Sequence, residues 1–198
     1  MRTLSPSRPG AVRRLALGTL LAMALGATGL QAAVVSYTAP LTGPAESPPN
    51  ASPGSGFAQV DLDIVAHTMR VIVTFQDLIG TVTAAHIHGP TSTAGTGTAG
   101  VATVTPTFTG FPGGVTSGSY DHTFDLTLAG SFNASFVAAN GGTAASAEAA
   151  LEAAIAAGKA YVNIHTSAFG GGEIRGFLIS TSVPTDFSTW GQVKSLYR

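Results

Sequence analysis

The chain consists largely of short stretches in which apolar and polar residues alternate. Between positions 58 and 64, every even position is apolar and every odd position is Gln or Asp. This period of two is typical of a strand that buries one face of an antiparallel sheet. Strand-like stretches recur at residues 34–41, 57–65, 69–75, 81–88, 99–108, 119–128, 131–137, 159–166 and 173–180. The pattern predicts an all-β fold, either an antiparallel β-sandwich or a flattened barrel.

One segment departs from this alternation and predicts a single short helix. Residues 146–157 are rich in alanine, Leu151 and Ile155 are four positions apart, and Gly158 follows. Alanine favours helix, and a glycine is a common residue just past a helix end. We find no internal repeat, so residues 33–182 are expected to form one domain.

The N-terminal region has the layout of a secretory signal peptide. Four arginines precede an uncharged apolar run over residues 15–30, and small residues surround Ala32. We therefore expect residues 1–32 to be removed on export. The run is about 16 residues, shorter than the roughly 20 of a bilayer-spanning helix, so no membrane span is expected after removal. The expected location is the cell exterior, secreted or periplasmic, and residues 183–198 are interpreted as a C-terminal tail.

Net charge and cysteine content limit the binding partners and the metal sites that this chain can have. Without the signal peptide, five Lys and Arg stand against ten Asp and Glu, a net charge of −5. An acidic chain with so few basic residues is a poor candidate for binding nucleic acid. The chain has no cysteine, which excludes disulfides, thiolate metal sites and cysteine nucleophiles. Any transition-metal site has to use His, Asp or Glu.

His86 and His88 are the sharpest local signal for a binding site. Residues two apart on a strand point to the same side, so both imidazoles share a face opposite Ala85 and Ile87. A pair of histidines on one face is what a copper or zinc site needs from a single strand. The alternative is that both are ordinary polar residues on a solvated face.

A third histidine lies in a similar setting later in the chain. In residues 160–166 the apolar positions alternate with Tyr161, Asn163 and His165, which share the other face. His165 is therefore expected to lie off the main core and is a candidate third ligand. His122, on a predicted strand of its own, is an additional candidate ligand.

The residues that follow predict a hairpin with a polar face. If a turn over residues 167–172 joins two strands, His165 pairs with Glu173 and Asn163 pairs with Arg175. A carboxylate beside an imidazole is a common way to orient a histidine ligand. The alternative interpretation is a cross-strand polar cluster on a sheet surface.

Four short motifs occur in order along residues 33–182. They are Leu-Thr-Gly-Pro-Ala-Glu-Ser-Pro-Pro at 41–49, Ala-His-Ile-His-Gly at 85–89, Tyr-Val-Asn-Ile-His-Thr at 161–166 and Gly-Glu-Ile-Arg-Gly at 172–176. In these motifs the chain resembles the CHRD domain, a module named from chordin that also occurs alone in exported bacterial proteins. The resemblance implies a β-rich extracellular domain. It places the histidines, Glu173 and Arg175 in the motifs that define the module, and it adds Glu46 as a candidate site residue.

Three functions are compatible with these observations. The first is a secreted binding or adhesion module with a histidine-centred site for copper, zinc or another ligand, whose partner is an extracellular protein, a glycan or the metal itself. The second is a structural envelope or matrix protein without a ligand. The third is a copper-dependent redox enzyme, by a likeness in geometry to copper–zinc superoxide dismutase. The sequence shows no designated proton donor, so we name no catalytic residue and favour a non-enzymatic role.

Overall fold

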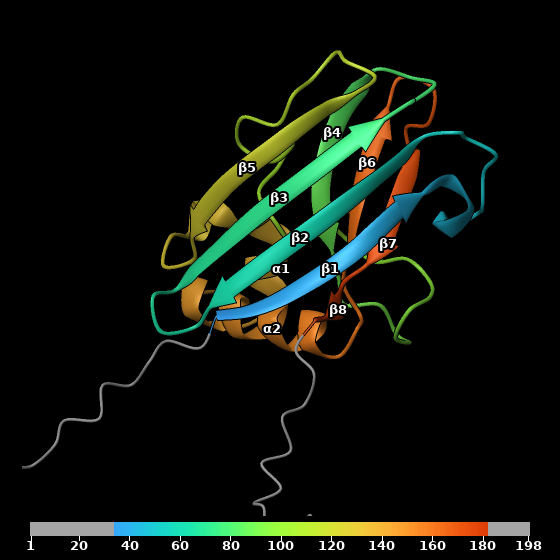
Figure 1. Cartoon of the computed structure of the whole chain (residues 1–198). Helices are drawn as coiled ribbons and strands as arrows, with labels where there is room; N and C mark the ends of the chain where they lie inside the picture. The colour runs from blue at the N-terminus through green and yellow to red at the C-terminus, as the bar shows by residue number, and fades with distance from the viewer. Residues whose placement is uncertain (1–33, 182–198) are drawn as a thin grey trace, which may run out of the picture. The chain divides into compact units, whose positions relative to one another are not determined.

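The computed structural model describes residues 34–181 (Figure 1). The predicted signal peptide at 1–32 and the predicted tail at 183–198 lie outside the described residues. In residues 34–181 there is no helix long and apolar enough to cross a membrane.

Eight antiparallel strands form one sheet that curls into a half-barrel, which confirms the predicted all-β fold. The strand order is β4-β6-β7-β1-β2-β3-β5, and β8 pairs with β1. The strands are β1 (Val34–Thr42), β2 (Ser55–Asp63), β3 (Thr68–Gln76), β4 (Val82–His88), β5 (Gly118–Asp125), β6 (Tyr161–Thr166), β7 (Ile174–Phe177) and β8 (Ile179–Ser180). The sheet therefore places β4 and β5 at its two opposite edges.

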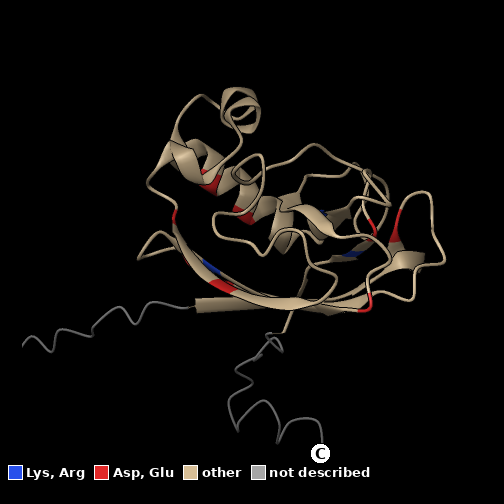
Figure 2. Cartoon of the chain, turned by 90° about the horizontal axis from the view of Figure 1, so that it is seen from above, with Lys and Arg blue, Asp and Glu red and all other residues tan. Residues whose placement is uncertain are grey.

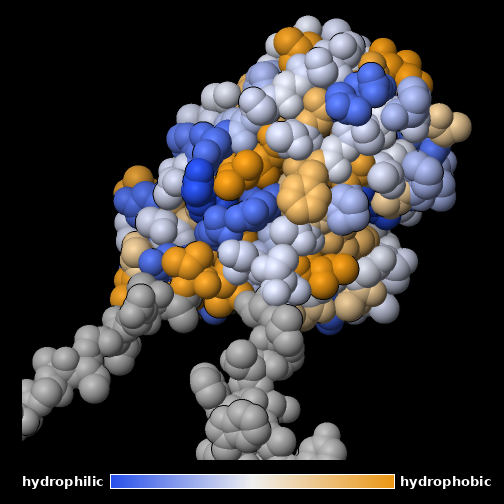
Figure 3. Space-filling view, viewed as in Figure 1, coloured by the Kyte–Doolittle hydropathy of each residue, from blue (hydrophilic) through white to orange (hydrophobic). Residues whose placement is uncertain are grey.

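The alternation seen in the sequence sorts side chains between the two faces of the sheet. Ala58, Val60 and Leu62 of β2 are buried in the hydrophobic core, which lies on the concave side. The convex face over β2, β3 and β5 carries polar side chains with separate hydrophobic ones among them (Figure 3). One polar pair there is Arg70 with Asp121, at 2.6 Å. The apolar residues of the alternating pattern thus face the core and the polar ones face solvent, as expected for an antiparallel sheet with one buried face.

The helices lie on the concave side of the sheet (Figure 2). They are the 3₁₀ turns η1 (Gly43–Ala45) and η2 (Ala129–Ser131) and the α-helices α1 (Ala134–Ala139) and α2 (Ala144–Ala156). The predicted helix at 146–157 is confirmed as α2, which buries Leu151 and Ile155 against the core. The sequence had indicated only one helix.

The strand predicted at 131–137 is wrong, because most of that segment forms α1. The Asn133 side chain accepts a hydrogen bond from the backbone N–H of Ser135 at 2.9 Å and so begins the helix. A capping asparagine satisfies one of the free N–H groups of the first turn, which favours helix over an extended strand. The side chain of Phe136 still faces the core, as it would have done from a strand.

The strand predicted at 99–108 is also wrong. This segment makes only isolated bridges, between Val101 and His88 and between Thr103 and Phe132. Some backbone N–H groups on the outer edge of β4 donate to threonine hydroxyls of this segment. The Thr107 Oγ1 accepts from the Ala85 N–H at 2.9 Å, and the Thr103 Oγ1 accepts from the Ile87 N–H at 3.0 Å. The segment therefore runs along the edge of β4 without adding a strand to it.

Candidate metal centre

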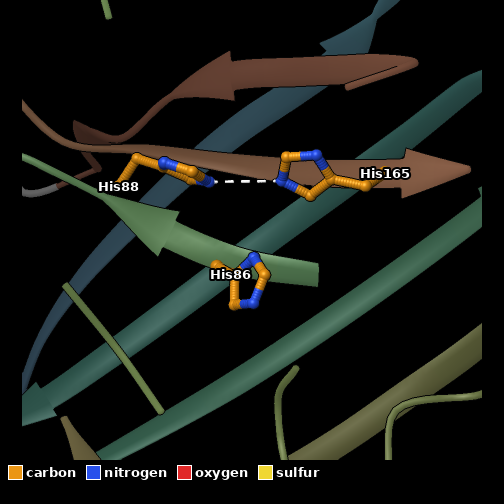
Figure 4. Close-up of side chains that lie close together, drawn as sticks. All are labelled: His86, His88 and His165. Carbon is orange, nitrogen blue, oxygen red and sulfur yellow. Dashed lines mark hydrogen bonds between the residues drawn. The ribbon is translucent and has the colours of Figure 1, made fainter. Parts of the chain in front are cut away.

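The structure brings His86, His88 and His165 together on one face of the sheet. His86 and His88 lie on β4, and His165 lies on the neighbouring strand β6, where its Cα is paired with that of Ala84. The three rings face one another from the two strands (Figure 4). One candidate ligand nitrogen from each residue lies within 4.8 Å of the other two. Ala85 and Ile87 point into the core on the opposite face, as the alternation predicted.

Each of the three rings is fixed by one hydrogen bond to a backbone carbonyl. The Nδ1 of His88 lies 3.0 Å from the carbonyl oxygen of Ala99, and the Nδ1 of His165 lies 3.0 Å from that of Gly170. For His86 the bond is made by Nε2, at 2.7 Å from the Pro106 carbonyl oxygen. A carbonyl oxygen can only accept, so each of these nitrogens carries the proton. The other nitrogen of each neutral ring therefore carries a lone pair.

These lone pairs face one another, and no hydrogen-bond donor of residues 34–181 lies between them. The Nε2 atoms of His88 and His165 approach to 3.3 Å (Figure 4, dashed line). The Nδ1 of His86 is buried and has no hydrogen-bond partner among the described residues. Two nitrogens that ligate one tetrahedral ion at 2.0–2.1 Å lie roughly 3.3 Å apart. The separation of the His88 and His165 nitrogens matches this value, and a nitrogen of His86 lies within 4.8 Å of both.

Burial keeps the three imidazoles in the neutral form that binds metals. His86 and His88 are 6% and 8% exposed, and His165 is partly exposed. Burial lowers the pKa of all three side chains, and it lowers the pKa of His88 to about 4. The alternative of polar residues on an open, solvated sheet face therefore does not describe this part of the molecule.

The Glu173 side chain does not make the predicted contact with His165. Its fully buried carboxylate accepts hydrogen bonds from the hydroxyls of Ser52 and Thr166, at 2.6 and 2.7 Å, and from the backbone N–H groups of Ile79 and Gly80. Burial acts to raise the pKa of Glu173, but these four bonds together lower it below its ordinary value. No hydrogen bond joins it to His165 within residues 34–181.

The physical reason is a change of backbone direction just before β7. Gly172 has a φ of +131°, a conformation that favours glycine, and it breaks the regular strand at Glu173. The carboxylate consequently reaches the turn between β3 and β4 instead of the imidazole. Backbone carbonyls, and not a carboxylate, orient all three histidines. This corrects the role that the sequence suggested for Glu173.

Asn163 and Arg175 are paired across β6 and β7, as the predicted hairpin required. The Arg175 guanidinium donates to the backbone carbonyls of Ala45 and Gly97. It also lies over the ring of Tyr161, with Cζ 4.8 Å from the ring centroid. This buried arginine therefore ties two loops to the sheet beside the histidine cluster.

Tyr161 connects Arg175 to the cluster. Its ring is stacked on that of His88, with centroids 5.0 Å apart and an interplanar angle of 6°. Its hydroxyl lies 3.3 Å from the Ala99 N–H, in the same residue whose carbonyl fixes His88. Tyr161 and Arg175 thus lie directly behind one of the three candidate ligands, whereas Glu173 does not.

The two additional candidates, Glu46 and His122, are not among the three grouped residues. Glu46 lies beside Arg175, with Oε2 3.7 Å from the arginine Nε, and its Oε1 is buried without a hydrogen-bond partner. Burial raises the pKa of Glu46 to about 7 against the opposing effect of Arg175. His122 lies on β5, at the far edge of the sheet, in ring contact with Tyr120 and Phe124.

The sequence reasoning missed the three carbonyls that orient the rings, which belong to Ala99, Pro106 and Gly170. All three lie in connections between strands, and every residue type carries a carbonyl. No side-chain pattern marks such a group, so only the folded chain reveals it.

Fold and site together define an antiparallel β domain that carries a three-histidine cluster on the face opposite its core. The sequence profile of the CHRD domain matches residues 37–178. This match spans most of the chain and includes all three histidines. The chain belongs to the CHRD domain family. Searches of curated proteins and of solved structures found no match.

Proposed function

We propose that this domain is a metal-binding module of the cell exterior that holds one copper or zinc ion. The ligands would be the Nδ1 of His86 and the Nε2 atoms of His88 and His165. The observation that carries the proposal is the convergence of three imidazole lone pairs whose tautomers are each set by a backbone carbonyl. Metal-binding histidines commonly donate their other N–H to a carbonyl or carboxylate in this way.

The donor set favours copper or zinc over other ions. Calcium and magnesium prefer oxygen ligands, and this cluster offers only nitrogens. Imidazole suits zinc, copper, iron and nickel, and among divalent ions the general order of affinity places copper highest. Three neutral nitrogens therefore support copper first and zinc second.

A purely structural role accounts for Glu173 but not for the histidines. Glu173 uses its hydrogen bonds to hold β7, β6 and two loops together. The histidine cluster, by contrast, leaves a buried nitrogen of His86 unsatisfied and sets two lone pairs against each other. Buried polar groups without partners reduce stability. A bound ion would remove that cost, which is why we favour metal binding over a ligand-free role.

Export supports a site of this kind. The signal peptide predicted at 1–32 and the extracellular location that the family implies support a domain that works outside the reducing cytoplasm. The small number of basic residues between 34 and 181, with Arg70 paired to Asp121 and Arg175 buried, also favours a metal over a nucleic acid as the partner.

The proposal is tested by metal analysis of protein exported by its host and purified without a histidine tag. The variants are a His86→Ala/His88→Ala double mutant and His122→Ala, which removes a histidine of the same sheet outside the cluster. We expect about one copper or zinc per chain in the wild type and in His122→Ala, and none in the double mutant. Wild-type protein that retains neither metal after loading and dialysis would refute the proposal.

A further inference from the structure

We infer that the bound ion leaves a coordination position to a small anion from solvent, such as an azide-like or carboxylate-like monoanion. The inference rests on the proposed function, because it concerns the same three-histidine site. It adds the chemical class of the exogenous ligand, and it follows from the charges around the cluster.

The three ligands themselves bring no negative charge. An imidazole that binds a metal is neutral, and in each of these rings one nitrogen would donate to a carbonyl while the other offers its lone pair to the ion. A divalent ion bound to three imidazoles therefore keeps its full double charge. Two of these rings are more than nine-tenths buried, so water compensates that charge poorly.

The carboxylates near the cluster are already engaged. Glu173 receives four hydrogen bonds on the side of Thr166 and Ser52. Glu46 faces Arg175 at 3.7 Å. Neither is grouped with the three candidate ligands. No carboxylate of residues 34–181 therefore stands ready to neutralise an ion held by the three rings.

Arg175 is the cation beside the cluster. Burial raises the pKa of the neighbouring Glu46 carboxyl to about 7, so below that pH this carboxyl is largely protonated and leaves the Arg175 charge uncancelled. The Arg175 guanidinium carbon is 4.8 Å from the centroid of the Tyr161 ring, and that centroid is 5.0 Å from the His88 ring. The guanidinium thus lies within about 10 Å of a candidate ligand, the sum of those two distances. At an effective dielectric constant of ~20, one charge about 10 Å from a bound monoanion changes the affinity for that anion about tenfold.

Access to the ion is expected from the side of His165. This residue is the only one of the three that is partly exposed, whereas His86 and His88 are covered. The turn that carries the Gly170 carbonyl lies against the His165 ring on that side, so we expect a small anion to reach the ion more readily than a large ligand. Charge and access therefore both favour a small monoanion.

The test uses the full exported protein loaded with copper(II), titrated with sodium azide at constant ionic strength set by sodium perchlorate. We expect a saturable azide-to-copper charge-transfer band and a changed electron paramagnetic resonance spectrum, with one azide per copper. An unchanged spectrum on a copper-loaded sample would overturn this inference while leaving the metal site intact. A sample that takes up no copper would overturn the metal site, and this inference with it.

Charge variants test the contribution of Arg175. Arg175→Met is expected to weaken azide binding about tenfold, and Arg175→Lys, which keeps the charge, is expected to bind azide nearly as the wild type does. Above pH 7, where Glu46 is largely ionised, Glu46→Gln removes a neighbouring negative charge and should tighten azide binding. Copper content and circular dichroism establish that each variant is folded and loaded. Equal azide affinity in folded Arg175→Met and wild type would rule out a role for this charge, and the wild-type titration decides the inference even if Arg175→Met fails to fold.

Discussion

Replacing Glu173 by glutamine isolates the buried carboxylate that the structure assigns to sheet pairing. The wild-type side chain is fully buried and accepts four hydrogen bonds, two at each oxygen. Glutamine has nearly the same shape but offers only one acceptor oxygen. Its amide nitrogen would face two donors in the place of the other oxygen.

The expected loss of stability follows from which donors can adapt. The hydroxyls of Ser52 and Thr166 can rotate to accept from the new amide, but the backbone N–H groups of Ile79 and Gly80 cannot. One buried N–H therefore loses its acceptor, which costs about 1–3 kcal/mol, and the charge-assisted character of the remaining bonds is lost. We expect Glu173→Gln to lower the free energy of unfolding by about 3 kcal/mol.

Urea denaturation followed by circular dichroism measures this loss. With a slope near 2 kcal/mol per molar urea, a loss of about 3 kcal/mol lowers the midpoint by roughly 1.5 M. Asp77→Asn is the matched control, because it makes the same chemical change at an exposed position. Its midpoint should stay close to that of the wild type.

Metal content decides between the structural assignment of Glu173 and the role that the sequence suggested for it. Since Glu173 makes no hydrogen bond to the histidines in the described part of the chain, the folded Glu173→Gln protein should bind copper as tightly as the wild type does. A variant with wild-type stability but weakened copper binding would refute the reasoning and would restore Glu173 as a residue that orients His165.

Three further predictions concern the histidine cluster and Glu46. Copper or zinc at 100 times its dissociation constant should stabilise the wild type by about 2.7 kcal/mol and raise its melting temperature by several degrees in calorimetry, with no rise in His88→Ala. In the metal-free protein, the pKa of His88 is about 4 when folded and near 6.5 when unfolded, so the unfolded state takes up a proton first as the pH falls. Stability should therefore drop by about 3 kcal/mol between pH 6.5 and 4, and a His88→Gln variant measured by urea denaturation should lack this part of the drop. The pKa of Glu46 is raised to about 7, so its ionisation disfavours the folded state as the pH rises from 4.5 to 7. The difference in unfolding free energy between Glu46→Gln and the wild type should therefore shift by up to about 3 kcal/mol in favour of the variant from pH 4 to pH 8. Equal pH profiles of stability for the two proteins would contradict this.

Much of the sheet could be predicted from the sequence, because the alternation of apolar and polar residues depends only on neighbours in the chain. The period of two places Ala85 and Ile87 in the core and His86 and His88 together on the other face. The pairing of Asn163 with Arg175 also follows from the position of the turn between two strong strands. These features depend on residues that are near each other in the chain.

The two mistaken strands show where local patterns do not suffice. Residues 99–108 and 131–137 alternate as strands do, yet the first is held along β4 partly by threonine hydroxyls and the second is mostly converted to helix by the Asn133 cap. In both cases a side chain provides the hydrogen bond that a neighbouring strand would otherwise have supplied. Whether a side chain or a neighbouring strand supplies these hydrogen bonds depends on what the fold places next to the segment.

The sequence by itself determined the fold class and the three histidines, because strand periodicity fixes which side chains share a face. Only the tertiary structure decided that two of those histidines are buried and that the carbonyls of Ala99, Pro106 and Gly170 set the tautomers of all three. It also decided that the Glu173 side chain turns to the loop between β3 and β4. These features depend on connections between strands, whose backbone groups are the same for every residue type. Their positions are fixed by packing across the sheet and not by the local order of residues.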